Sequence, residues 1–201
     1  MRVLIARHGE SEWNRLGRIQ GHQDSGLTSI GAAQAESLAD IWRSENIDEV
    51  ICSPLARARD TAIIVSQSLQ SNWRVDDFFI EQSLGEFEGL YLNDARLIHP
   101  DIDHIFQNQT DMYNFKGETI QQAGQRVLTR LKMLSIDSNR TIGVITHGNC
   151  LQGMVWLLSG SSSEDTGEFY HFNCSFTELC IDQSNIQLKR WAVATHLLRW
   201  M

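Results

Sequence analysis

Three short runs along the chain predict strands that are buried on both faces. Residues 3–6, 49–52 and 141–145 are almost continuously apolar. Such runs are typical of strands in a parallel sheet that helices cover on both sides.

Between these runs, apolar residues recur at helical spacing. One predicted helix begins near Thr28, whose hydroxyl suits an N-cap. A second begins at Ser53-Pro54, with serine as the N-cap and proline at the first helical position. A third spans about residues 119–134. Strands that alternate with helices in this way predict an α/β fold.

The spacing of apolar residues changes near the end of the chain. Phe172, Cys174 and Phe176 alternate with other residues, and so do Ile186 and Leu188 after a turn-like stretch at 182–185. This period of two predicts a hairpin at an edge of the sheet. We therefore expect a three-layer sandwich with a mostly parallel central sheet, an antiparallel edge and helices on both faces.

The stretch from about 90 to 117 has weak periodicity, and we interpret it as a cap-like insertion in a single domain that spans residues 1–201. In open α/β sheets, ligands bind beyond the carboxyl ends of the strands. We expect the insertion to cover one end of the sheet.

Composition narrows the possible partners. The 201 residues are 42% hydrophobic and carry a formal net charge of -8, which makes nucleic acids and anionic membranes poor partners. The four cysteines show no CxxC spacing, so neither a disulfide framework nor a zinc site is expected. We find no signal-peptide pattern and no apolar stretch of about 20 residues, so we expect a soluble cytoplasmic protein.

Two of the predicted strands end in a histidine followed by glycine. The first runs into Arg7-His8-Gly9, and the last runs into Thr146-His147-Gly148. Glycine allows a ligand to approach the main chain closely. Arg57 falls in the first turn of the helix after the 49–52 strand, where helix geometry already favours anions. An arginine at this position can bind phosphate through its planar fork.

These residues belong to a longer set of motifs that resembles the histidine phosphatase superfamily, in the branch that includes cofactor-dependent phosphoglycerate mutases. The matching blocks are LIARHGESEWN at 4–14, GRIQG at 17–21, LTSIGAAQA at 27–35, SPLARA at 53–58, Glu81 with GEFEG at 85–89, GET at 117–119 and THG at 146–148. They follow the family's order over residues 3–149. The resemblance implies a phosphoglycerate mutase-like fold.

The resemblance also implies a phosphate pocket and a mechanism. His8 would be the nucleophile that forms a phosphohistidine. Arg7, Arg57 and a protonated His147 would neutralise the phosphoryl oxygens, so no metal or other cofactor is expected. The substrate-binding residues implied are Arg7, Asn14, Gln20, Gly21, Arg57, His147 and Gly148.

The leaving group needs a proton, and three carboxylates could supply it. Spacing alone does not choose between Glu81, Glu86 and Glu88. The resemblance selects Glu81 as the acid that protonates the leaving group and the base that then activates water. The chain departs from the family pattern at Gln82, where a basic residue is common, and at Asn149, where glycine is common. Phe87 stands where tryptophan is common, and Thr146 where serine is common.

The expected function is a phosphomonoesterase that acts on a small phosphorylated metabolite, as a monomer or homodimer. The alternatives are a phosphoglycerate mutase, a non-catalytic scaffold and a zinc hydrolase that uses both histidines. Family mutases are longer, whereas here Glu81 and Gly117 are 36 positions apart and the chain ends soon after residue 195. The substrate stays open among a sugar phosphate, a phosphoglycerate, phosphoserine and a cobalamin-precursor phosphate.

Overall fold

The computed structural model describes residues 1–108, 112–136, 139–160, 169–182 and 185–200, and its centre is one six-stranded sheet. The strand order is β3-β2-β4-β1-β5-β6. The first four strands are parallel, β5 is antiparallel to β1, and β6 is antiparallel to β5. The strands are β1 (Arg2–Arg7), β2 (Glu49–Cys52), β3 (Asn72–Val75), β4 (Thr141–Thr146), β5 (Phe176–Asp182) and β6 (Asn185–Val193). The predicted fold class is confirmed.

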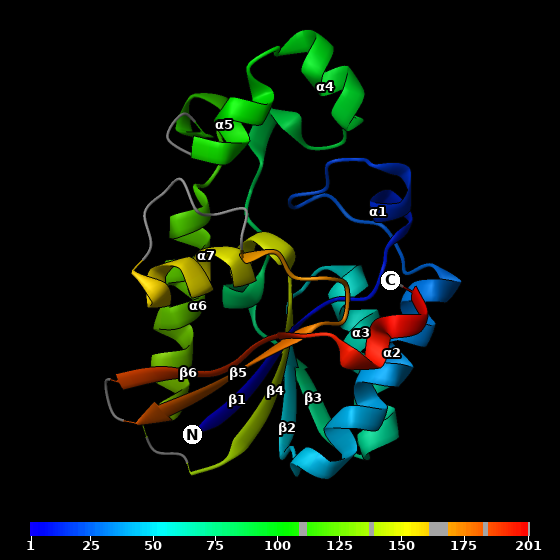
Figure 1. Ribbon diagram of the computed structural model, residues 1–201, viewed down its shortest axis with the longest axis vertical. Coiled ribbons are helices and arrows are strands. Elements are labelled where there is room, and N and C mark those ends of the chain that lie inside the picture. The colour runs from blue at the N-terminus through cyan, green and yellow to red at the C-terminus, as the bar shows by residue number, and fades with distance from the viewer. Residues whose placement is uncertain (109–111, 137–138, 161–168, 183–184, 201) are drawn as a thin grey trace.

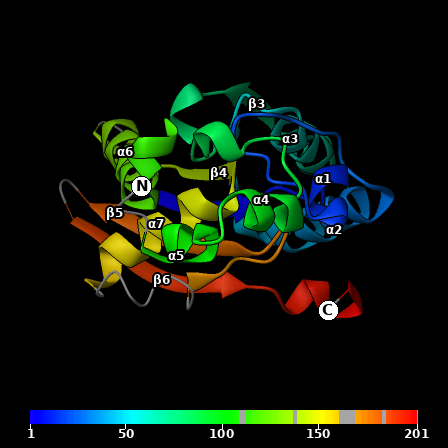
Figure 2. The ribbon, with the colours of Figure 1, turned by 90° about the horizontal axis from the view of Figure 1, so that it is seen from above.

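Helices cover both faces of the sheet (Figures 1 and 2). On one face lie α2 (Ser29–Trp42) and α3 (Ala56–Leu69), and on the other lie α6 (Ile120–Ser135) and α7 (Gly148–Ser159). Alternate residues of β1 enter the two cores: Val3 and Ile5 pack under α6 and α7, whereas Leu4 and Ala6 pack under α2 and α3. This two-sided burial is the physical reason for the continuous apolar runs.

Two of the three predicted helix starts are correct. The Thr28 hydroxyl accepts a hydrogen bond from the Gly31 N–H, and Thr119 forms a capping box with Gln122. The start at Ser53-Pro54 was wrong, because α3 begins at Ala56 and its N-cap is Leu55. The Ser53 hydroxyl instead lies 2.7 Å from the His147 ring.

The predicted hairpin is present at the sheet edge as β5 and β6, although residues 183 and 184 of its turn lie outside the described residues. Phe172 and Cys174 were expected to share its alternation, but they precede β5. The Cys174 N–H donates to the carbonyls of Arg7 and His8, which holds this loop against the end of β1. Strand β3 was missed because it has only four residues, mostly exposed, in which polar and apolar side chains alternate too briefly to give a clear signal.

Beyond the carboxyl ends of the strands lie the short helices α1 (Glu12–Leu16), α4 (Leu92–Ile98) and α5 (Ile102–Asn108), as Figure 1 shows. The 90–117 stretch, of which 109–111 are outside the described residues, thus carries helical structure. A third, smaller core joins it to neighbouring segments and contains Ile19, Leu84, Phe87, Ala95, Ile102, Ile105 and Met112. The 3₁₀ turns are Arg43–Glu45, Asp77–Phe79, Gly85–Phe87, Met112–Phe115 and Thr195–Trp200. Within the described ranges, no helix has the length and apolar character needed to cross a membrane.

Candidate active site

One polar residue follows the carboxyl end of each of three neighbouring parallel strands, at the same edge of the sheet. His8, His147 and Ser53 are the first residues after β1, β4 and β2 respectively. The His8 N–H donates to the Thr146 carbonyl, and the Ser53 N–H donates to the Ile145 carbonyl, so the register of the sheet continues into the site. The two histidine rings are almost fully buried, with centroids 5.1 Å apart. The structure therefore brings together the two strand-end histidines that the sequence pointed to.

His8 is held in the form that a nucleophile requires. Its Nδ1 lies 2.6 Å from the Gly9 carbonyl oxygen. Because a carbonyl only accepts, Nδ1 carries the proton of the neutral ring and Nε2 keeps a free lone pair. Burial, followed by the charges of Arg57 and Arg7, lowers the pKa of His8 well below its usual value. A Cβ at Gly9 would lie 2.4 Å from the Gly31 oxygen, so only glycine fits there.

His147 is oriented by a residue whose role the sequence did not reveal. The Ser53 hydroxyl lies 2.7 Å from His147 Nε2 and can donate to it, which leaves Nδ1 as the protonated nitrogen. Burial and the Arg57 charge lower the pKa of His147 well below its usual value. The pKa direction in this structure thus favours a neutral ring, in contrast to the protonated His147 expected from the resemblance. A neutral Nδ1–H still donates a hydrogen bond.

Arg57 and Arg7 are anchored by part of their guanidinium groups only. Arg57 donates from Nη1 to the Gln23 carbonyl and to Asp24, and from Nη2 to the Gly21 carbonyl. Arg7 donates from Nη1 to the Tyr170 hydroxyl and the His171 carbonyl. Among the described residues, the buried nitrogens Arg7 Nε, Arg57 Nε and His147 Nδ1 have no hydrogen-bond partner. Buried donors without partners are rare, and three at one site suit an anion with several oxygens.

The other predicted contact residues surround this group. Asn14 Oδ1 accepts from Ser11 and from Asn173 Nδ2, at 3.3 Å from the latter. Gln20 is buried, and its oxygen accepts from the Ser11 and Ser25 hydroxyls, so it holds the loop that carries Gly21. Gly148 begins α7, where an added Cβ would lie 3.4 Å from Arg7 Nε.

The structure distinguishes the three candidate carboxylates. Glu81 Oε1 accepts from the backbone N–H groups of Gln82, at 2.9 Å, and Cys150, at 3.4 Å. Its charge acts on Arg57, where it favours the protonated guanidinium. Glu86 is exposed and pairs with Lys116, and Glu88 accepts from the Leu84 N–H. Of the three, Glu81 is the carboxylate that combines near-complete burial with a charge acting on Arg57.

Two departures from the family pattern contact each other. Gln82 donates from Nε2 to the Glu118 carbonyl at 2.5 Å, so its Oε1 must be the atom that accepts from Asn149 Nδ2 at 2.8 Å. Gln82 is completely buried. The residue that replaces a basic side chain and the residue that replaces glycine thus form one hydrogen-bonded pair.

A cavity of about 510 Å³ adjoins Arg7 and leads towards the helices beyond the sheet. Its walls contain both polar and apolar residues, and α4 and α5 each contribute an apolar side chain. Its lining is Arg7, Trp13, Asn14, Gly17, Arg18, Ile19, Leu84, Leu92, Phe106, Asn149 and Tyr170. The described part of the chain contains no group of three or more His, Cys, Asp or Glu residues that could hold a metal ion.

A buried histidine with a free lone pair, grouped with two arginines and an acid, is an arrangement suited to phosphoryl transfer. The family is shown by comparison: residues 3–194 match the model of the histidine phosphatase superfamily (branch 1). The chain belongs to this superfamily, and it is an enzyme of the phosphatase class.

Some relatives are named as phosphatases and others as phosphoglycerate mutases. The chain is 30% identical to a putative phosphoserine phosphatase 2 of Hydrogenobacter thermophilus, over 89% of this chain and 88% of the relative. It is 28% identical to a metal-independent phosphoserine phosphatase of Arabidopsis thaliana, over 97% and 82%. A 2,3-bisphosphoglycerate-dependent phosphoglycerate mutase of Methylobacterium is 31% identical over 81% and 82%. Among solved structures, Bacillus stearothermophilus YhfR superposes with a TM-score of 0.90 at 25% identity, over 97% and 98%.

Proposed function

We propose that this phosphatase hydrolyses small phosphomonoesters through a phosphohistidine on His8, without a metal. His8 Nε2 forms a bond to phosphorus while the ester oxygen leaves and takes a proton from Glu81. Glu81, now ionised, removes a proton from water, and the hydroxide attacks the phosphoryl group. The bond from phosphorus to Nε2 breaks, and inorganic phosphate leaves.

The observation that carries this proposal is the set of three unpaired buried nitrogens around the free lone pair of His8. Arg7 Nε, Arg57 Nε and His147 Nδ1 are donors that a phosphoryl group can satisfy as its charge spreads over the equatorial oxygens. The dianion would also oppose the depression of the His147 pKa, because an opposite charge favours the protonated ring.

Metal independence follows from the same groups. The two guanidinium groups and His147 provide the charge that a magnesium ion supplies in other phosphoryl-transfer enzymes. The name of the Arabidopsis relative agrees with this proposal. Activity should survive prolonged EDTA treatment and should be inhibited by vanadate, and recovery of lost activity by one specific metal would contradict it.

We propose hydrolysis rather than isomerisation as the main reaction. A mutase must keep water away from its phosphohistidine, whereas the segment between Glu81 and Gly117 is short and, among the described residues, contributes Leu92 of α4 and Phe106 of α5 to the cavity wall. We further propose that 90–117 serves as the cap of a single histidine phosphatase domain. Two relatives name phosphoserine as a substrate, so phosphoserine is the first candidate in a phosphomonoester screen.

The test supplies 3-phosphoglycerate with 2,3-bisphosphoglycerate and follows 2-phosphoglycerate and free phosphate together. Phosphate release should be faster. Isomerisation much faster than phosphate release would make the enzyme a mutase.

A further inference from the structure

Glu81 is carried by a segment that lies outside the sheet. Strand β3 ends at Val75, and a 3₁₀ turn at Asp77–Phe79 follows, after which the backbone is extended through Ile80. No strand of the described part of the chain pairs with residues 78–81, so their carbonyl groups need other partners. The position of the carboxylate depends on those partners.

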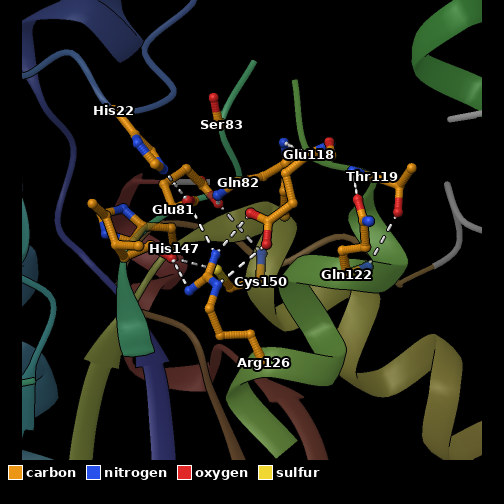
Figure 3. Close-up of polar contacts among 12 residues, drawn as sticks. His22, Glu81, Gln82, Ser83, Glu118, Thr119, Gln122, Arg126, His147 and Cys150 are labelled. Atoms are coloured by element: carbon orange, nitrogen blue, oxygen red, sulfur yellow. Dashed lines mark hydrogen bonds and ion pairs between the residues drawn. The ribbon is translucent and has the colours of Figure 1, made fainter. Parts of the chain in front are cut away.

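Arg126 of α6 supplies most of them (Figure 3). Its Nη1 donates to the carbonyls of Phe78, at 2.7 Å, and Ile80, at 2.8 Å. Its Nη2 donates to the Glu81 carbonyl at 3.3 Å and to Glu118 at 2.8 Å, and its Nε donates to Glu118 at 3.2 Å. All five N–H groups of this guanidinium are therefore used, and three of them bind the backbone that leads into Glu81.

The part of α6 that carries Arg126 is itself held firmly in place. Gly124, two residues earlier on α6, packs so closely on α7 that an added Cβ would lie 2.2 Å from the Gly153 carbonyl carbon. The ion pair with Glu118 then sets the plane of the guanidinium. Arg126 thus fixes residues 78–81 relative to the packed helices α6 and α7.

Other contacts secure the same segment from different sides. The Thr146 hydroxyl donates to the Phe79 carbonyl at 2.8 Å, between the two carbonyls that Arg126 binds. His22 Nε2 donates to the Glu81 carbonyl at 2.8 Å. These contacts preserve the approximate path of the chain when Arg126 is changed, so the loss of Arg126 should displace the carboxylate without unfolding the segment.

We propose that Arg126 is a positioning residue that holds Glu81 at the place where the leaving group must be protonated. This inference rests on the proposed acid and base role of Glu81. Arg126 binds backbone carbonyls rather than substrate, so its effect should fall on the proton transfer and not on phosphate binding. A displacement of about 1 Å can cost on the order of 100-fold in rate.

The experiment compares an alkyl phosphate, such as O-phosphoserine, with 4-nitrophenyl phosphate, whose leaving group needs no proton. Arg126→Ala should lower kcat/KM for the alkyl ester by about 100-fold and change kcat/KM for the aryl ester by less than about threefold, because kcat/KM ends at formation of the phosphohistidine and excludes the later activation of water. Arg126→Lys separates geometry from charge, because lysine keeps the charge but lacks the planar fork. It should behave like Arg126→Ala.

Arg130→Ala is the matched control, because Arg130 lies one turn further along α6 and pairs with Asp76 instead. It should leave the ratio of the two substrates unchanged. Wild-type activity in Arg126→Lys, or an equal loss on both substrates in every Arg126 variant, would overturn the positioning role. Glu81→Gln is measured alongside: if Arg126 variants lack a selective loss that Glu81→Gln shows, only this inference fails, whereas no selective loss in Glu81→Gln would overturn the acid and base role as well.

Discussion

His8, His147 and Ser53 each follow the last residue of a neighbouring parallel strand, whereas Glu81 follows an irregular segment outside the sheet. The half of the site that we propose binds phosphate is therefore positioned by backbone hydrogen bonds that continue the sheet register. The half that we propose supplies the acid and base depends on side chains for its position, and Arg126 binds three of its backbone carbonyls. A substitution near Glu81 should therefore displace its carboxylate more readily than a substitution near the strand ends displaces His8 or His147.

The difference has a chemical counterpart. In the proposed mechanism, the strand ends provide charge and a nucleophile, which every phosphomonoester needs. The irregular segment provides the proton for the leaving group, which only esters with poor leaving groups need, and later the base that activates water. Because kcat/KM ends at formation of the phosphohistidine, it reports the proton transfer alone. Variants in the two halves should therefore be separable by the choice of substrate.

The largest effect is expected for His8→Ala, which removes the nucleophile from the phosphate-binding half. Turnover of alkyl and aryl phosphates should fall together, by about 10⁴-fold or more, because both routes need the covalent intermediate. Acid-labile phosphate should be trapped on the wild type and be absent from the variant. Substantial turnover by His8→Ala would remove the phosphohistidine mechanism.

Glu81→Gln is expected to separate the two halves. Its kcat/KM should fall about 100-fold or more on alkyl phosphates and much less on 4-nitrophenyl phosphate, as a plot of kcat/KM against leaving-group pKa would show. Glu88→Gln is the control, since Glu88 accepts from the Leu84 N–H. A greater selective loss in Glu88→Gln would identify that residue as the acid.

Ser53→Ala should have a smaller effect and leave substrate choice unchanged. Without the hydroxyl, His147 Nε2 loses its partner at 2.7 Å, and the ring no longer has a fixed tautomer. We expect a decrease of about tenfold on both substrate types, measured as kcat/KM, with weaker vanadate inhibition. Ser66→Ala is a suitable control, because the Ser66 hydroxyl on α3 is buried and has no hydrogen-bond partner among the described residues. Equal kinetics in wild type and Ser53→Ala would show that the hydroxyl does not orient the ring.

Acid should lower the free energy of unfolding through the buried side chain of His171. Burial lowers the pKa of His171, whose carbonyl binds Arg7, to about 4. A lowered folded-state pKa means that the stability is present above the unfolded value of about 6.5 and is lost as pH falls through about 4. At pH 4 this one residue accounts for about 3 kcal/mol of the loss. Urea unfolding at pH 7 and pH 4 should show a smaller loss for His171→Gln; an identical loss would contradict the assignment.

Sequence patterns were most informative about the residues that lie at strand ends. The apolar runs located β1, β2 and β4, and the histidines after two of them could be placed at one edge of the sheet from the sequence alone. Ser53 was misread as a helix cap, because a serine before proline has the same local pattern whether its hydroxyl binds a helix or a histidine. Arg126 was missed for a different reason: its partners are backbone carbonyls more than forty residues away, which leave no trace in local sequence.

The hydrogen bond between Gln82 and Asn149 has a consequence for how this lineage can change. With Gln82 Nε2 bound to the Glu118 carbonyl, an aspartate at 149 would place a second acceptor opposite Gln82 Oε1, and a glycine would remove the Asn149 donor. A basic residue at 82 could not accept from Asn149 Nδ2, so the Asn149 amide would have to turn its oxygen towards the new donor. The side chains at 82 and 149 are therefore coupled, and the effect of a substitution at one position should depend on the residue at the other.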